Sequence, residues 1–159
     1  MKLIISPWSR LHPLNKDGGE CPKNYPYWKE LVKELRFLEV ETIQIGLYGE
    51  ALIGANRYSF IPSIKKLGEF IKECGEKWIG IDNFFPHLCH SLGIKGVVLW
   101  GISDPLIFGH ETNINILKDR KYLKPNQYDV WYAKDYNLEM WLKPEEIINI
   151  VIDYMRGVV

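Results

Sequence analysis

The stretch WIGIDNFFPHLCHSLGIKGVVLWGISDP, residues 78–105, decides the fold class of this chain. It opens with a short apolar run at residues 78–81 and ends after a second one at residues 97–100. Between them, residues 85–92 carry apolar side chains at i, i+3 and i+7, which is the spacing of one helix face. Strand, helix and strand within about thirty residues indicate one βαβ unit. Because both runs lack alternating polar residues, we expect parallel strands that are buried on both faces.

The rest of the chain repeats this alternation of strands and helices. Four further strands are expected: Lys2–Ile5, Thr42–Gly46, an edge strand within Asn56–Ile61 and a sixth strand within Asn113–Leu117. Further helices are expected from Pro26 to Leu38, from Pro62-Ser63 to Cys74 with Ile64 on its apolar face, and from Pro144 to Arg156. The sequence predicts a single three-layer, Rossmann-like α/β domain over residues 1–159. Its sheet would be doubly wound and mainly parallel, with five or six strands in the order 3-2-1-4-5.

Composition and charge narrow the class of protein. The 159 residues include 20 basic and 20 acidic side chains, so no overall basic field points to nucleic acid. Three cysteines at irregular spacing argue against a disulfide framework and for a reducing compartment. The apolar run near the N-terminus is too short for a signal peptide, and no run has the length of a membrane span. We therefore expect a cytoplasmic protein with no membrane span.

Polar residues gather where the first strand of the central unit ends. Asp82 and Asn83 follow that strand directly, and His87 lies in the first turn of the next helix. In open α/β sheets, ligands bind at the carboxyl ends of the strands. A helix N-terminus also offers free N–H groups to an anion such as phosphate. The alternative is that Asp82 only caps the helix and that His87 is structural.

Several kinds of site find no support in the sequence. His87 and His90 are spaced to share a helix face near Asp82, but no second Cys/His pair has zinc-site spacing, so no metal is predicted. The dinucleotide, Walker and nucleophile-elbow motifs are absent. We predict no cofactor and assign no catalytic residue.

Four segments taken together resemble one family. Lys23-Asn24-Tyr25-Pro26 opens the first helix, and Gly46 is followed by Gly49-Glu50. The turn Asp82–His87 precedes the central helix, and the apolar strand Val97–Trp100 ends in Gly101. In this order and spacing the chain resembles the C-terminal, donor-nucleotide-binding half of the family 9 glycosyltransferases. These are the lipopolysaccharide heptosyltransferases of the GT-B fold, and the similarity runs from Leu3 to the last helix.

The resemblance implies a donor site. Lys23 would meet a donor phosphate, and Glu50 would accept hydrogen bonds from ribose hydroxyls. Asp82, Asn83 and His87 would complete the phosphate and nucleotide site. Six further residues at the same edge are expected to line the pocket: Ser6, Trp8, Gly46, Trp100, Gly101 and Asp104.

Each of these residues also has an ordinary structural interpretation. Lys23 and Glu50 would then be exposed loop residues, Trp100 a core residue and Asp104 part of a turn. The family usually has glycine where this chain has Phe84. A side chain at that position stands close to the expected phosphate and disfavours a positive φ.

The resemblance covers only the donor half of a two-domain enzyme, whose acceptor domain would supply the catalytic base. We therefore expect nucleotide-sugar binding and glycosyl transfer without an essential metal, with a partner chain or a second copy supplying the acceptor side. The alternative is a non-catalytic nucleotide-binding or assembly module that keeps only the fold.

An exposed aromatic patch at the carboxyl edge of the sheet would mark the surface for that partner. The residues expected there are Trp8, Tyr25, Tyr48, Trp100 and Phe108, of which Trp100 is the one most prone to fold into the core.

Overall fold

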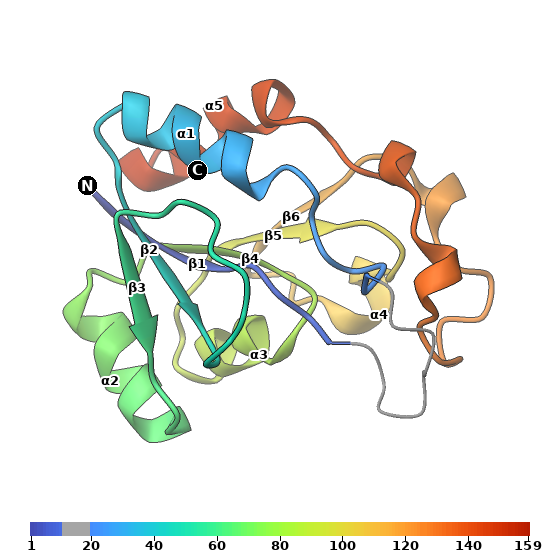
Figure 1. Ribbon diagram of the computed structural model, residues 1–159, viewed down its shortest axis with the longest axis horizontal. Coiled ribbons are helices and arrows are strands. Elements are labelled where there is room, and N and C mark those ends of the chain that lie inside the picture. Colours follow the sequence, from blue (N-terminus) through green and yellow to red (C-terminus); the bar gives the residue numbers. More distant parts are fainter. Residues whose placement is uncertain (11–19) are drawn as a thin grey trace.

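The computed structural model describes residues 1–10 and 20–159. Within this part of the chain, six strands form one sheet: β1 (Lys2–Ser6), β2 (Glu41–Gly46), β3 (Arg57–Phe60), β4 (Trp78–Ile81), β5 (Val97–Trp100) and β6 (Ile114–Leu117). The strands lie in the order β3-β2-β1-β4-β5-β6, and all five neighbouring pairs are parallel (Figure 1). The predicted strand order is confirmed, and both short segments, β3 and β6, are edge strands.

Helices cover both faces of this sheet (Figure 1). Helices α1 (Trp28–Phe37) and α5 (Pro144–Arg156) lie on one face, and α2 (Ile64–Glu73) and α3 (Phe84–Ser91) lie on the other. A short helix, α4 (Pro105–Phe108), follows β5. Three single-turn 3₁₀ helices, Arg120–Tyr122, Ala133–Asp135 and Leu138–Met140, lie in the long connection from β6 to α5. The predicted three-layer α/β architecture is therefore confirmed.

Strand alternation divides the core into two clusters. On β1, Leu3 and Ile5 belong to the cluster that includes α1 and α5, whereas Ile4 belongs to the cluster that includes α2 and α3. Successive side chains of a strand point to opposite faces, so an uninterrupted apolar run fills both clusters. Each fully buried aliphatic side chain contributes about 1.5–3 kcal/mol relative to an exposed one.

Some helix details differ from the prediction. Helix α1 begins at Trp28, two residues after Pro26, and Leu38 is its exposed C-cap rather than part of the buried face. The chain reverses there through Glu39, whose φ is 59°, to enter β2. Ile64 is exposed although its i, i+3, i+7 spacing places it on the same helix face as the buried Leu67 and Ile71, because it is the first residue of α2 and lies at the helix end.

The expected aromatic patch is smaller in the structure. Tyr25 is buried, contrary to the prediction, because its ring packs edge-on against Trp28 and Trp141, with centroids 5.2 and 5.6 Å away. Trp100 is also buried, as its core interpretation predicted, and its indole N–H donates to Asn115 Oδ1 over 2.9 Å. Tyr48 is exposed, and Trp8 and Phe108 are partly buried.

Candidate functional site

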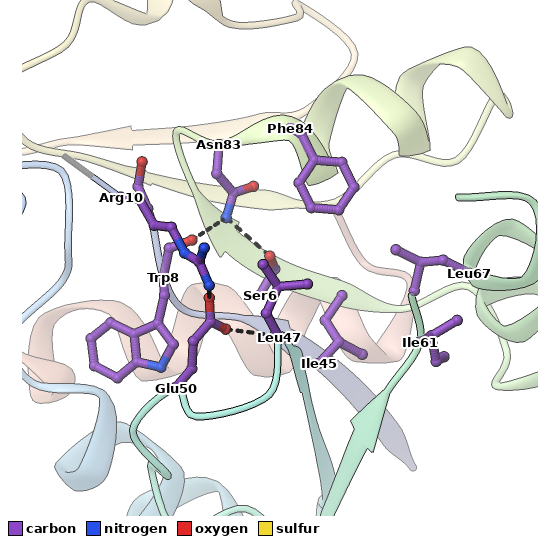
Figure 2. Close-up of a pocket in the computed structure, with 12 residues that line it drawn as sticks. Ser6, Trp8, Arg10, Ile45, Leu47, Glu50, Ile61, Leu67, Asn83 and Phe84 are labelled. Carbon is purple, nitrogen blue, oxygen red and sulfur yellow. Dashed lines mark hydrogen bonds and ion pairs between the residues drawn. The ribbon is translucent and has the colours of Figure 1, made fainter. Parts of the chain in front are cut away.

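A cavity of about 270 Å³ lies at the carboxyl ends of β1 and β2, beside the start of α3 (Figure 2). This is the edge at which open α/β sheets bind ligands. Its twelve lining residues are Ser6, Trp8, Ser9, Arg10, Ile45, Gly46, Leu47, Glu50, Ile61, Leu67, Asn83 and Phe84. Five of the sequence-predicted site residues therefore surround one cavity: Ser6, Trp8, Gly46, Glu50 and Asn83.

The cavity has two chemically different sides. Figure 2 shows Ile45, Ile61, Leu67 and Phe84 on one side. Trp8, Arg10 and Glu50 lie on the other side, and Asn83 lies between the two groups. An apolar wall that faces a few polar groups is the usual construction of a small-molecule site, because the wall supplies burial and the polar groups supply orientation.

Asn83 joins three segments at this site. Its Oδ1 accepts the N–H of Phe85 over 2.8 Å and caps α3, and its Nδ2 donates to Ser6 Oγ over 3.0 Å and to the Trp8 carbonyl over 3.1 Å. The helix cap is thus Asn83 and not Asp82. Since this bond uses the Phe85 N–H and Pro86 has none, two positions of the first turn are unavailable to an anion.

Glu50 is held against the end of β2. Its Oε2 accepts the N–H of Leu47 over 2.8 Å, and its Oε1 lies 3.6 Å from the guanidinium of Arg10, whose side chain is 66% exposed. A Cβ at Gly46 would collide with this Glu50 carboxylate, so a larger residue there would make the carboxylate move from its present position. Glu50 lines the cavity, and the 3.6 Å contact with the solvent-exposed Arg10 leaves Oε1 able to accept further hydrogen bonds.

Lys23 and Asp82 form a shielded ion pair beside the cavity. Lys23 Nζ lies 3.2 Å from Asp82 Oδ2, and the two side chains are only 14% and 10% exposed. The same ammonium lies 5.4 Å from the ring centre of Trp131, a cation–π distance. Neither residue lines the cavity, but Asp82 is the chain neighbour of Asn83, which does.

His87 does not line the cavity and belongs to a histidine cluster. Its Nδ1 lies 2.9 Å from Nε2 of His110, and the ring of His110 stacks on His90 with centroids 3.8 Å apart. Burial, and then the charges of His90 and His87, lower the pKa of His110. Among the residues that the structure describes, no three His, Cys, Asp or Glu side chains are placed to share a metal ion.

Three other predicted pocket residues, Trp100, Gly101 and Asp104, do not line this cavity. A Cβ at Gly101 would lie 2.6 Å from Cζ2 of Trp141, so the glycine permits close packing. Asp104 caps α4 by accepting the N–H of Leu106. Its carboxylate also accepts two hydrogen bonds from the guanidinium of Arg120, over 3.1 and 2.6 Å. The hydrogen bonds from Arg120 are the main cause that lowers the pKa of Asp104.

The cysteines take no part in the site. All three are free thiols, and burial raises the pKa of each, that of Cys89 to about 12. A thiol that stays protonated is not an activated nucleophile. No helix within residues 1–10 and 20–159 is long and apolar enough to cross a membrane.

Sequence reasoning did not identify several lining residues. Arg10, Ile61 and Leu67 come from the segment after β1, the end of β3 and the buried face of α2. The one available signal was position, because Ile61 is the last residue of the segment in which the edge strand was predicted. Phe84 was noticed only as a departure from the family. Its backbone is helical and its φ is not positive, so its side chain is accommodated without strain in the cavity wall.

No protein-family model and no curated protein sequence matches the chain. Solved structures do match it. ADP-heptose lipopolysaccharide heptosyltransferase II of E. coli superposes with a TM-score of 0.63 at 15% identity, over 98% of this chain and 47% of that one. The iron-containing dodecameric glycosyltransferase TibC of enterotoxigenic E. coli gives 0.69 at 13% identity, over 99% and 45%.

A family 9 glycosyltransferase of Veillonella parvula gives a TM-score of 0.63 at 14% identity, over 96% of this chain and 47% of that one. The chain thus spans less than half the length of each of these three structures. The chain has the fold of one half of the family 9 glycosyltransferases, the C-terminal-like half that its sequence resembles.

Proposed function

We propose that this chain binds the nucleotide part of a nucleotide sugar in the cavity between β2 and α3, as the donor half of a heptosyltransferase-like glycosyltransferase. One observation carries the proposal. Five residues chosen from sequence for a donor site surround a single cavity at the carboxyl edge of the sheet. That cavity is too small for a whole nucleotide sugar, so it would hold the base and ribose.

The two sides of the cavity suit these two groups. A planar base would lie against the apolar wall of Ile45, Ile61, Leu67 and Phe84. The ribose hydroxyls would donate to Oε1 of Glu50, whose other oxygen is occupied by the N–H of Leu47. Phe84 would then contribute to binding, because its ring supplies apolar surface next to the base.

The phosphates would leave the cavity toward Lys23. Its ammonium spends one of three donors on Asp82, so two remain for an anion. Arg10 lines the cavity itself and is the nearer cation for the first phosphate. Because the N-terminus of α3 has lost two donors to Asn83 and Pro86, side-chain cations carry more of the phosphate binding here than the helix end does.

Isothermal titration with ADP, GDP and UDP, and with their glucose esters, tests the proposal. The name of one matching structure, an ADP-heptose transferase, makes ADP the first probe. We expect Glu50→Gln to weaken ADP about tenfold, because a carboxylate hydrogen bond is worth about 1.5–3 kcal/mol. The same variant should weaken 2′-deoxy-ADP less. Glu139→Gln, an exposed glutamate of another segment, is the matched control.

Glycosyl transfer needs an acceptor side, which we propose is supplied by a second Rossmann-like domain or a second copy of this chain. No residue of this chain is assigned as the catalytic base. Sedimentation at micromolar concentration, with and without ADP, tests association, and a monomer in both conditions contradicts the second-copy proposal. We place the activity in the cytoplasm, where the three free thiols would stay reduced.

The alternative is an assembly module that kept the fold and lost the site. The pairing of Lys23 with Asp82 favours it, since the expected phosphate ligand is already neutralised. The same titration decides between the two functions. Failure of all three nucleoside diphosphates and their glucose esters to bind would support the module and overturn donor binding.

A further inference from the structure

Three aromatic side chains form a cluster beyond β5. The ring of Phe108 lies 6.4 Å from that of Tyr128 and 6.3 Å from that of Trp131, edge-on to both. Phe108 and Trp131 are partly buried, whereas Tyr128 is 83% exposed. The cluster thus presents the ring of Tyr128 to solvent, and the partly buried ring of Phe108 packs against it.

The loop that carries Tyr128 is held on both sides. The buried amide of Gln127 accepts the N–H of Asp104 over 2.8 Å and donates to the carbonyls of Ile102 and Lys124 over 3.0 and 2.8 Å. A loop fixed by a buried side chain loses little further entropy when it binds a ligand.

Lys124 fixes the other flank of this loop. Its ammonium donates to the Val130 carbonyl over 2.6 Å and pairs with Asp129 and Asp135 at 3.2 and 3.0 Å. It also lies over the rings of Trp131 and Tyr132. Tyr128 is therefore an exposed ring on a fixed backbone, which is the construction of a pre-formed contact surface.

This cluster adjoins the proposed phosphate position. Trp131 lies 5.4 Å from Lys23 Nζ, and Lys23 pairs with Asp82, the chain neighbour of the cavity residue Asn83. In Figure 1 the orange segment after β6 lies at the same end of the molecule as α4 and the blue segment before α1. A path of adjacent side chains therefore runs from the cavity past Lys23, Trp131 and Phe108 to Tyr128.

We propose that the aromatic cluster of Phe108, Tyr128 and Trp131 binds the sugar ring of the donor, with Tyr128 stacked on the apolar C–H face of that ring. The inference rests on the proposed donor function. A sugar is joined directly to the terminal phosphate, so a phosphate at Lys23 places the sugar beside Trp131. The carboxylate of Asp129, next to Tyr128, can accept hydrogen bonds from the sugar hydroxyls.

Titration of paired ligands isolates the contribution of the sugar. Each nucleoside diphosphate is compared with its glucose ester on the wild-type chain, Tyr128→Ala and Tyr128→Phe. We expect Tyr128→Ala to weaken the glucose ester about three- to tenfold, the range of an aromatic contact, and to leave the diphosphate unchanged. Tyr128→Phe should restore binding because it keeps the ring. Phe37→Ala, which removes an exposed ring on α1, should change neither ligand.

The outcomes separate this inference from the proposed function. Suppose that the diphosphates bind, and that Tyr128→Ala weakens a diphosphate and its glucose ester equally or weakens neither. The proposal that the aromatic cluster binds the sugar is then wrong, whereas the proposal that the cavity binds the nucleotide is retained. If no diphosphate and no ester binds, both proposals are overturned. If Tyr128→Ala changes the sedimentation of the protein but not its affinity for the ligands, the Tyr128 ring contacts another protein chain, and the proposal that it binds the sugar is overturned.

Discussion

Replacing Asn83 with alanine removes three hydrogen bonds: the cap of α3 and two bonds that tie the start of α3 to the end of β1 and to the segment after it. The cap to the Phe85 N–H is lost together with the bonds to Ser6 Oγ and the Trp8 carbonyl. Helix α3 and the Trp8 segment form adjacent sides of the cavity (Figure 2). The substitution therefore tests whether one side chain holds the site together.

The expected magnitude follows from the geometry. Loss of an Asn cap costs about 1 kcal/mol, and each further hydrogen bond contributes about 0.5–1.5 kcal/mol. Asn83 is only partly buried and borders an open cavity, so water can replace the lost donors and the lower values apply. We expect Asn83→Ala to lower the free energy of unfolding by about 2 kcal/mol.

Urea denaturation followed by circular dichroism measures this loss. The matched control is Asn137→Ala, because within residues 1–10 and 20–159 the exposed Asn137 side chain makes only a cap bond, from the Glu139 N–H at 2.9 Å. That variant should lose about 0.5–1 kcal/mol. Asn83→Asp keeps the cap acceptor but loses both donated bonds, so its stability should fall between wild type and Asn83→Ala. If Asn83→Ala loses no more than the control, Asn83 does not join the two sides of the cavity.

Three other predictions concern the surroundings of the site. The pKa of His110 is lowered in the folded protein, so the unfolded chain binds more protons near this pKa; the contribution of neutral His110 to stability is complete above pH 6.5 and is lost as the pH falls below that value. The urea midpoints at about pH 5 and about pH 8 should therefore differ less in His110→Gln than in wild type, and an equal difference in the two proteins would contradict this. Gly101→Ala should lower the free energy of unfolding by about 1–3 kcal/mol, because the added Cβ meets the Trp141 ring, and an unchanged urea midpoint would show that the ring can move. Arg120→Ala should destabilise the protein at neutral pH through the loss of its bonds to Asp104. That difference from wild type should vanish as the pH falls below 3.8, the ordinary pKa of Asp104; a difference that persists in acid would rule out the ion pair as its cause.

The sequence by itself determined the sheet and its strand order. The runs 78–81 and 97–100 are apolar throughout, and the helical spacing between them is local, so a parallel βαβ unit follows from neighbouring residues. The right-handed crossover rule then limits the order of the remaining strands. The sequence also predicted that Asp82 and Asn83 lie at the ligand-binding edge, because the end of a strand is visible as the end of an apolar run.

Only the tertiary structure decided what each polar residue at that edge does. Asp82 and Asn83 are adjacent in sequence, yet Asn83 bonds to Ser6 and borders the cavity while Asp82 pairs with Lys23, 59 residues away. Successive side chains at the end of a strand point to opposite sides, so the partner of each depends on which distant segment packs there.

The same reason explains the residues that the sequence could not assign. From sequence, Gly101 was predicted to line the pocket. In the structure the ring of Trp141, forty residues later in the chain, occupies the space where a side chain of residue 101 would lie. His87 follows the strand end as closely as a ligand residue would, but it lies against His110 from the segment after α4. Local spacing determines which face of an element is buried. Packing between distant elements determines which of its polar side chains reach the cavity.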